Sequence, residues 1–346
     1  MRWFSIGLLA FLCLVLAGVG AASLVSTQRS ALEYFQIKPQ EPLQAEADNS
    51  DLQFQDFERI ANVPYGPHGV RNHLDIYRPL KRDSSIPVIV ISHGGLGWKG
   101  ETPESFAVPL LERGYAVVQI NYRHVTGFGN LPKDECGEFP AQIQDAKAAI
   151  RFVRANAEKY GFDADRIGAM GHSMGGYISA MLCTTSDLDI FNDDGENREH
   201  SSAVQAACSS NGPTDWRTML HERYYLAEHL SLEYHFDELG DQKDSNPEDF
   251  GSYLTKGSIR VAEQASPITY ASSGDPPILL ITGFQDLVVP PHQHHALFVR
   301  LRNVGGDAQI RIIPGAGHFG PAMMNRETRT MAADFFDQHL LSTSAP

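Results

Sequence analysis

Short, nearly continuous apolar runs recur along the chain. They occupy residues 87–91, 115–120, 167–170, 277–281 and 310–313. Apolar runs of this length that lack polar alternation are typical of strands covered on both faces. Because parallel strands are buried in this way, the pattern predicts a central sheet that is mostly parallel.

A helical pattern lies between two of these runs, at residues 140–160. Its apolar positions recur at steps of three and four: Ile143, Ala146, Ile150, Val153 and Ala157. Pro140 suits the start of a helix, and Gly161 suits its end. Strands that alternate with helices predict an α/β fold, a doubly wound sheet with right-handed crossovers and helices on both faces.

Two regions depart from this alternation. Residues 57–63 and 72–79 flank a turn at 66–69, and their pattern predicts an antiparallel pair at the N-terminal edge of the sheet. Residues 210–275 are rich in aromatic side chains and lie between two predicted strands. We interpret this stretch as a cap insertion over the functional site, within one domain that spans 52–342.

The N-terminus has the pattern of an export segment. Residues 3–26 are almost entirely apolar, and no charge appears between Arg2 and Arg29. Small residues near the end of the run resemble a signal-peptidase site, and the run is also long enough to span a bilayer. Residues 1–22 are therefore predicted to be a signal peptide, or a membrane anchor if uncleaved. A polar linker or arm follows at 23–51, and the mature domain is expected to be exported, periplasmic or secreted.

Net charge and the spacing of possible metal ligands argue against nucleic-acid and metal binding. The chain has 28 Lys and Arg against 42 Asp and Glu, a formal charge of -14, so we expect no nucleic-acid partner. The acidic run at 187–196 lacks calcium-loop spacing, since Ile190 and Ser201 fall where the first and last carboxylates belong. The histidines within 292–295 lack a further ligand at suitable spacing. No metal or cofactor is predicted, and the oligomeric state stays open.

Cysteine usage leaves two alternatives. In an oxidising compartment, Cys183 and Cys208 are the pair best placed to form a disulfide. The other interpretation is that both are small, buried apolar residues.

The segment GHSMG at residues 171–175 follows a predicted strand and precedes a helix-like run. A serine at such a turn is held in a strained conformation that requires small neighbours, and it projects its hydroxyl above the sheet. The N-terminus of the following helix also favours a developing negative charge. Ser173 is therefore predicted to be a nucleophile.

A nucleophilic serine needs a base and an orienting carboxylate. His318 follows the apolar run at 310–313 in a glycine-rich loop, and Asp286 follows the run at 277–281. The chain order of serine, aspartate and histidine is the one that α/β hydrolases use. Asp215 and Asp307 are rivals for the carboxylate, but Asp215 lies ahead of most of the cap stretch, and Asp307 is expected at the opposite end of the sheet.

The loop after the first apolar run is rich in glycine. Its backbone amides can approach a substrate oxygen, which predicts an oxyanion hole. We expect donors from Gly94 or Gly95, with Leu96 as a further candidate, together with the amide of Met174. His93 is interpreted as a residue that shapes the loop by hydrogen bonding, not as a base.

Six segments carry a family resemblance: HGGLGW at 93–98, INYR at 120–123, residues 139–168, GHSMGG at 171–176, NGPTDW at 211–216 and GAGH at 315–318. Together they resemble the α/β-hydrolase carboxylesterases of the acetyl and feruloyl esterase type. The resemblance implies the α/β-hydrolase fold, Ser173 as nucleophile, Asp286 as orienting acid and His318 as base. The chain departs from the family pattern at two places. Leu96 replaces the third glycine common in the HGG loop, and His172-Ser173-Met174 replaces the more usual Gly-Ser-Ala.

The leading hypothesis is a serine-dependent carboxylic ester hydrolase that forms an acyl-enzyme and acts on short-chain, acetyl or feruloyl-type esters, small or polysaccharide-linked. Two alternatives stay open. One is a serine peptidase of the oligopeptidase-like class, and the other is a catalytically silent binding protein on a hydrolase scaffold.

Overall fold

A computed structural model describes most of the predicted domain. The described residues are 57–80, 85–95, 97–99, 104–126, 132–186, 188–192, 195–219, 254–255 and 258–341. The predicted export segment, the arm, Leu96 and residues 220–253 of the predicted cap lie outside them. Within these ranges, the structure contains no helix long and apolar enough to cross a membrane.

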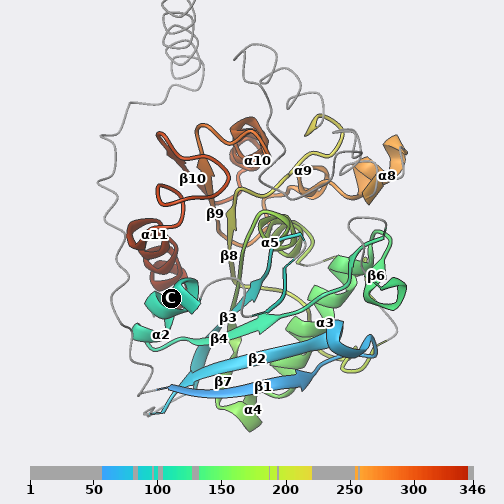
Figure 1. The fold of residues 1–346 in the computed structure, drawn as a ribbon, viewed down its shortest axis with the longest axis vertical. Coiled ribbons are helices and arrows are strands. Elements are labelled where there is room, and N and C mark those ends of the chain that lie inside the picture. The colour runs from blue at the N-terminus through green and yellow to red at the C-terminus, as the bar shows by residue number, and fades with distance from the viewer. Residues whose placement is uncertain are drawn as a thin grey trace, which may run out of the picture.

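The described part of the chain is built on an eight-stranded sheet of order β1-β2-β4-β3-β7-β8-β9-β10 (Figure 1). The strands are β1 (Phe57–Pro64), β2 (His73–Pro79), β3 (Ile86–Ser92), β4 (Ala116–Ile120), β7 (Phe162–His172), β8 (Ala206–Ser210), β9 (Ile278–Gly283) and β10 (Ala308–Ile313). β1 and β2 pair antiparallel, as do β2 and β4, whereas every other neighbouring pair is parallel. The predicted parallel sheet with an antiparallel N-terminal edge is confirmed.

Helices cover both faces of this sheet. The longer ones are α2 (Glu104–Glu112), α3 (Ala141–Ala155), α5 (Met174–Thr184), α10 (Pro291–Asn303) and α11 (Arg326–Phe336). Shorter elements are α4 (Ala157–Tyr160), α8 (Ile259–Gln264), α9 (Pro267–Tyr270), the strand pair β5 (His124–Val125) and β6 (Cys136–Gly137), and single turns at Gly69–Asn72, Lys133–Glu135 and Asp337–Leu341. The apolar side chains of α3, α5 and α10 pack on one face, and those of α2 and α11 pack on the other.

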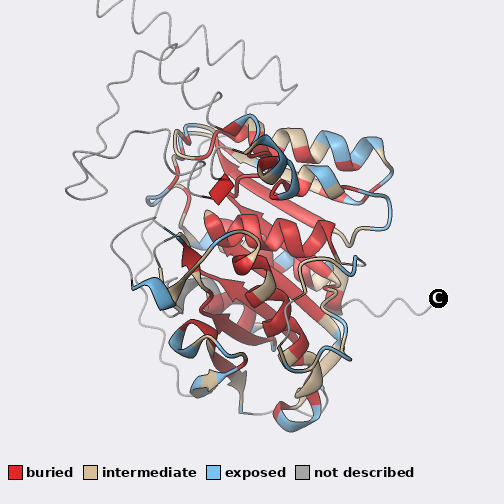
Figure 2. Ribbon diagram, turned by 90° about the vertical axis from the view of Figure 1, so that its right-hand side faces the viewer, coloured by how far each residue is buried: buried red, intermediate tan, exposed pale blue. Residues whose placement is uncertain are grey.

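Burial follows strand position in the sheet. Every residue of β3, β4, β8 and β9 is buried, and Figure 2 shows this buried centre between less buried layers. β10 was expected to be covered on both faces, but Arg311 is exposed and Ile310 and Ile312 are only partly buried. The expectation was wrong because β10 is an edge strand that pairs only with β9.

The helix predicted at 140–160 is present as α3 followed by α4, with Asn156 between them. Gly161 ends α4 with a φ of 71°, in the left-handed region that glycine adopts without strain. The helix returns the chain to the start of β7, which then runs to the predicted nucleophile.

The cysteines form no disulfide among the described residues. Cys183 packs with α10 on one face of the sheet, whereas Cys208 points from β8 into the core on the other face. Because the sheet separates them, the disulfide alternative is wrong, and the other interpretation, two small buried residues, is confirmed. Burial raises the pKa of both thiols, that of Cys208 to about 12.

The register of the parallel strands brings their carboxyl ends to one edge. Ser92 lies opposite Gly171, and Gly171 lies opposite Ser209. Further along the sheet, Ile313 lies opposite Gly283. The loops that carry the predicted site residues therefore all leave from this edge, where ligands bind in sheets of this type.

Candidate active site

Ser173 stands between β7 and α5 with a φ of 57° and a ψ of -120°, a strained backbone conformation for a residue with a Cβ atom. Its amide donates to the Ser210 carbonyl at 2.8 Å, and its carbonyl accepts from Tyr177 at 2.9 Å, which starts the helix. The flanking residues are buried, but Ser173 itself is partly exposed. The turn therefore holds the hydroxyl at the surface of an otherwise buried segment.

The glycines around this turn are required by close backbone contacts. A Cβ atom on Gly175 would lie 2.1 Å from the Ser92 carbonyl oxygen, and one on Gly171 would lie 2.4 Å from the Gly175 carbonyl carbon. Backbone atoms in buried strands cannot move away from such a contact as a flexible side chain can. The start of α5 is therefore packed directly against the end of β3.

We expect Gly175→Ala to destabilise the protein by about 2 kcal/mol or more, because the new methyl group overpacks a buried backbone contact. Thermal and urea unfolding measure the loss. Gly274→Ala is the matched control, since its nearest heavy atom would lie 3.8 Å away, an ordinary contact. Equal stability of the two variants would contradict the packing described here.

Ser173, His318 and Asp286 form one hydrogen-bonded chain. The Ser173 hydroxyl lies 2.9 Å from His318 Nε2, and His318 Nδ1 lies 2.7 Å from Asp286 Oδ2. Because a carboxylate only accepts, Nδ1 carries the proton and Nε2 is left as the acceptor for the serine hydroxyl. The histidine is thus held in the tautomer that can remove a proton from Ser173.

Asp286 is fully buried, and its second oxygen is also satisfied. Oδ1 accepts from the backbone amides of Val288 and Val289, each at 2.8 Å. These bonds orient the carboxylate so that Oδ2 faces His318. The rival Asp215 instead makes a bidentate pair with Arg217. Asp307 precedes β10, at the opposite end of the sheet.

Asn211 connects the loops that carry the histidine and the aspartate. Its side-chain amide donates to the His318 carbonyl at 3.0 Å, and its side-chain oxygen accepts from the Gly283 amide at 2.9 Å. In the sequence, Asn211 stood out only as part of the NGPTDW segment. Its φ of 46° lies in the left-handed region, which asparagine tolerates better than most residues do.

Buried aromatic side chains hold the glycine loop after β3 through its backbone carbonyls. The Tyr122 hydroxyl lies 2.8 Å from the His93 carbonyl oxygen and 3.1 Å from that of Gly94, and it donates a shared hydrogen bond. His93 Nδ1 lies 2.7 Å from the Gly94 carbonyl oxygen, and His124 Nδ1 lies 2.7 Å from that of Gly95. All three carbonyls of the loop are thereby drawn towards buried rings.

This arrangement orients the amides of the loop. In a planar trans peptide the N–H points opposite to the preceding carbonyl, so the N–H groups of Gly94 and Gly95 point away from Tyr122. The loop also lies beside the serine turn, because a Cβ on Gly94 would stand 4.0 Å from the His172 carbonyl oxygen. The two amides therefore point away from the buried layer that holds the carbonyls.

The histidines beneath the loop are neutral at physiological pH. Burial lowers the pKa of His93 to about 3. Burial and the nearby Arg71 guanidinium lower that of His124 to about 4. Each neutral ring uses Nδ1–H as the donor to its carbonyl. His93 thus shapes the loop, as predicted from the sequence, and Tyr122 and His124 are supports that the sequence did not reveal.

Arg71 completes this buried layer. Its guanidinium lies 3.4 Å from the centre of the Trp98 ring and 2.8 Å from the Glu135 carboxylate. A stacked guanidinium with a carboxylate partner is a stable buried arrangement. It fixes Trp98 at the end of the glycine loop.

No group of three or more His, Cys, Asp or Glu side chains within the described ranges could hold a metal ion. His294, from the histidine-rich helix start, is instead a structural residue. Its Nε2 accepts from the Gly212 amide at 3.1 Å and lies 3.0 Å from the Ser209 hydroxyl.

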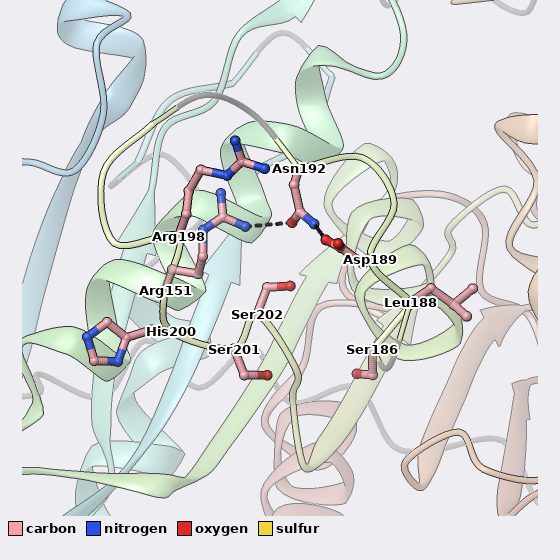
Figure 3. Close-up of a pocket in the computed structure, with 9 residues that line it drawn as sticks. All are labelled: Arg151, Ser186, Leu188, Asp189, Asn192, Arg198, His200, Ser201 and Ser202. Atoms are coloured by element: carbon pink, nitrogen blue, oxygen red, sulfur yellow. Dashed lines mark hydrogen bonds between the residues drawn. The ribbon is translucent and has the colours of Figure 1, made fainter.

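A polar pocket of about 380 Å³ opens near the other end of α5 (Figure 3). Its lining includes Arg151, Arg198 and His200, together with Ser186 just after the helix. None of the residues of the Ser173 chain lines it. The pocket is therefore separate from the site described above.

The fold and the strand-to-helix serine turn define an α/β hydrolase. The chain belongs to the BD-FAE family, which it matches over residues 74–301. The resemblance to α/β-hydrolase esterases drawn from six sequence segments is confirmed.

Two relatives come from Mycobacterium tuberculosis. The chain is 30% identical over 262 residues to the probable carboxylic ester hydrolase LipM, covering 72% of this chain and 53% of LipM. It is 30% identical over 270 residues to esterase LipQ, covering 75% of this chain and 57% of LipQ. The chain thus spans about half the length of these curated relatives.

Solved structures similar to this chain include carbohydrate esterases. A truncated carbohydrate esterase from gut microbiota is 29% identical, with a TM-score of 0.68, over 82% of this chain and 97% of that one. A bifunctional GH43-CE protein of Bacteroides eggerthii is 30% identical, with a TM-score of 0.66, over 82% of this chain and 35% of that one.

Proposed function

We propose that this protein is a serine-dependent carboxylic ester hydrolase. The observation that carries the proposal is the hydrogen-bonded chain from Ser173 through His318 to Asp286. It stands at the edge of the sheet where active sites of this fold class lie. The esterase names of the relatives support the same activity.

The first half of the proposed reaction is acylation. Ser173 Oγ attacks the ester carbonyl carbon while His318 Nε2 takes its proton, and Asp286 stabilises the imidazolium through Nδ1. The carbonyl oxygen becomes an oxyanion that accepts from the amides of Gly94 and Gly95 and from that of Met174 at the start of α5. The proton on Nε2 then passes to the alcohol oxygen, the C–O bond breaks, and an acyl-enzyme remains.

The second half repeats this proton path with water. His318 takes a proton from a water molecule, the hydroxide attacks the acyl carbon, and the proton returns to Ser173 as the carboxylic acid leaves. The chain's own residues supply the nucleophile, the base and the oxyanion donors. The proposed substrates are short-chain, acetyl or feruloyl-type esters, and the carbohydrate esterase among the similar structures favours esters carried on a carbohydrate.

We further propose that the protein works outside the cytoplasm. The support is the uncharged apolar run at residues 3–26. Fractionation of cells that express the full chain, with N-terminal sequencing of the product, tests both export and cleavage.

Hydrolysis of 4-nitrophenyl acetate, butyrate and octanoate by the full chain tests the activity, with 4-nitroanilide amides in parallel. The proposal expects ester turnover and labelling of the protein by a fluorophosphonate. Turnover of the amides at rates similar to those of the esters would favour a peptidase instead, and absence of both turnover and labelling would favour a binding protein.

Tyr122→Phe tests the proposed oxyanion loop. Losing the hydroxyl that anchors two carbonyls of the loop is expected to lower kcat about tenfold with little change in KM, since only transition-state binding is affected. The affinity for a boronic acid that mimics the tetrahedral intermediate should fall in parallel.

The matched control is Tyr115→Phe, which removes a tyrosine hydroxyl that donates to Asp337 at 3.0 Å. That bond lies at the start of β4, away from the glycine loop, so kcat should be unchanged. A Tyr122→Phe enzyme with wild-type kcat and boronate affinity would show that the hydroxyl does not position the loop.

A further inference from the structure

Phe319 directly follows His318 and is unusually exposed for its size. Six large apolar side chains are exposed in the part of the chain that the structure describes, and Phe319 is the aromatic one, with 57% of its surface accessible. An exposed aromatic ring beside the Ser173–His318 pair offers an open apolar surface to a bound ligand.

The Phe319 ring contacts two imidazole rings of the site. Its centre lies 4.5 Å from that of the His318 ring, edge to face, and 5.3 Å from that of the His172 ring. The backbone fixes this position, since Asn211 holds the His318 carbonyl and Gly320 turns the chain with a φ of 97°. The phenyl ring therefore contacts both imidazoles, while more than half of its surface stays open.

The proposed reaction indicates which part of the substrate lies beside the Phe319 ring. The leaving alcohol oxygen must come within about 3 Å of His318 Nε2 to receive its proton. The carbon chain attached to that oxygen therefore begins beside the imidazole, where Phe319 lies. The acyl group, by contrast, extends from the carbonyl carbon, whose oxygen faces the Gly94 and Gly95 amides in the proposed reaction.

Resting on the proposed hydrolysis of esters carried on a carbohydrate, we propose that Phe319 is the residue that selects the alcohol part of the substrate, by stacking against its sugar ring. A pyranose has a flat face of C–H groups that can cover a phenyl ring, whereas a short linear alcohol covers little of it. Phe319 thus selects esters by their alcohol and leaves the acyl preference unaffected.

Two acetates that differ only in the alcohol test the proposal: a monoacetylated methyl xylopyranoside and ethyl acetate. Phe319→Ala is expected to lower kcat/KM for the sugar ester about tenfold, chiefly through KM, and to change that for ethyl acetate by less than about twofold. Phe319→Trp, which keeps an aromatic face, should retain the sugar ester activity.

The matched control is Leu80→Ala, because Leu80 is 58% exposed and follows the end of β2 away from the site. It should leave both substrates unaffected. A second series, ethyl acetate against ethyl butyrate, varies only the acyl group and should show the same ratio in wild type and Phe319→Ala.

Three results would overturn the proposal: no effect of Phe319→Ala on the sugar ester, equal losses on both acetates, or a changed acyl ratio. Equal losses would mean that the ring only supports His318. Wild-type turnover of ethyl acetate reports the proposed function independently, because it does not depend on stacking against Phe319. If the wild type hydrolyses none of the esters, binding of the intact sugar ester to wild type and Phe319→Ala, measured by calorimetry, decides whether the ring holds the sugar.

Discussion

Ser173→Ala is expected to lower kcat for ester hydrolysis by at least about ten-thousandfold, because the acyl-enzyme route is lost and only binding and oxyanion contacts remain. Steady-state hydrolysis of 4-nitrophenyl acetate measures the loss. Labelling by a fluorophosphonate should disappear with it. The fold should be retained, since the alanine keeps a small side chain at the turn.

Ser179→Ala is the matched control for this variant. Ser179 also lies in the serine-bearing segment, and its hydroxyl donates to the Gly175 carbonyl at 2.9 Å within α5. Removing it deletes a buried serine hydroxyl without touching the hydrogen-bonded chain, so kcat should stay near the wild-type value. Comparable activity of Ser173→Ala and Ser179→Ala would refute Ser173 as the nucleophile.

Asp286→Asn is expected to lower kcat about ten-thousandfold by trapping the wrong tautomer of His318. The amide oxygen of the asparagine can still accept from Val288 and Val289. Its NH₂ group then faces His318 Nδ1 and donates to it. The imidazole proton moves to Nε2, which can no longer accept the proton of Ser173.

The matched control is Asp215→Asn, at the rival carboxylate. Asp215 is paired with Arg217 and does not contact His318, so a small change in kcat is expected. Near-wild-type kcat for Asp286→Asn, or a larger loss for Asp215→Asn, would overturn the assignment. Unfolding curves of both variants separate loss of activity from loss of fold.

The sequence predicted the three residues of the hydrogen-bonded chain because each lies at the end of one strand. Ser173 stands in a glycine turn between a strand and a helix, and Asp286 and His318 each follow an apolar run. In a parallel sheet such loops must leave from the same edge, so strand order along the chain was sufficient to bring them together. The hydrogen bonds among the three side chains depend on the shapes of their loops, and these shapes are visible only in the structure.

The supporting residues could not be predicted in this way. Tyr122 and His124 act on a loop about 30 positions earlier in the chain, and that contact exists only because β3 and β4 are neighbours in the sheet. Asn211 joins two loops that lie more than 70 residues away. Each of these roles depends on tertiary packing. The residues adjacent in sequence show no hydrophobic pattern that would reveal such a contact.

The two buried cysteines have a consequence for how the protein can be made. Cys183 and Cys208 belong to separate cores on opposite sides of the sheet, and neither can reach the other without unfolding. Since Cys136 is free as well, the fold of the described domain contains no disulfide that thiol oxidation would have to form. It does not need a disulfide-forming machinery, and recombinant production in a reducing cytosol should yield the same fold as production in an oxidising compartment.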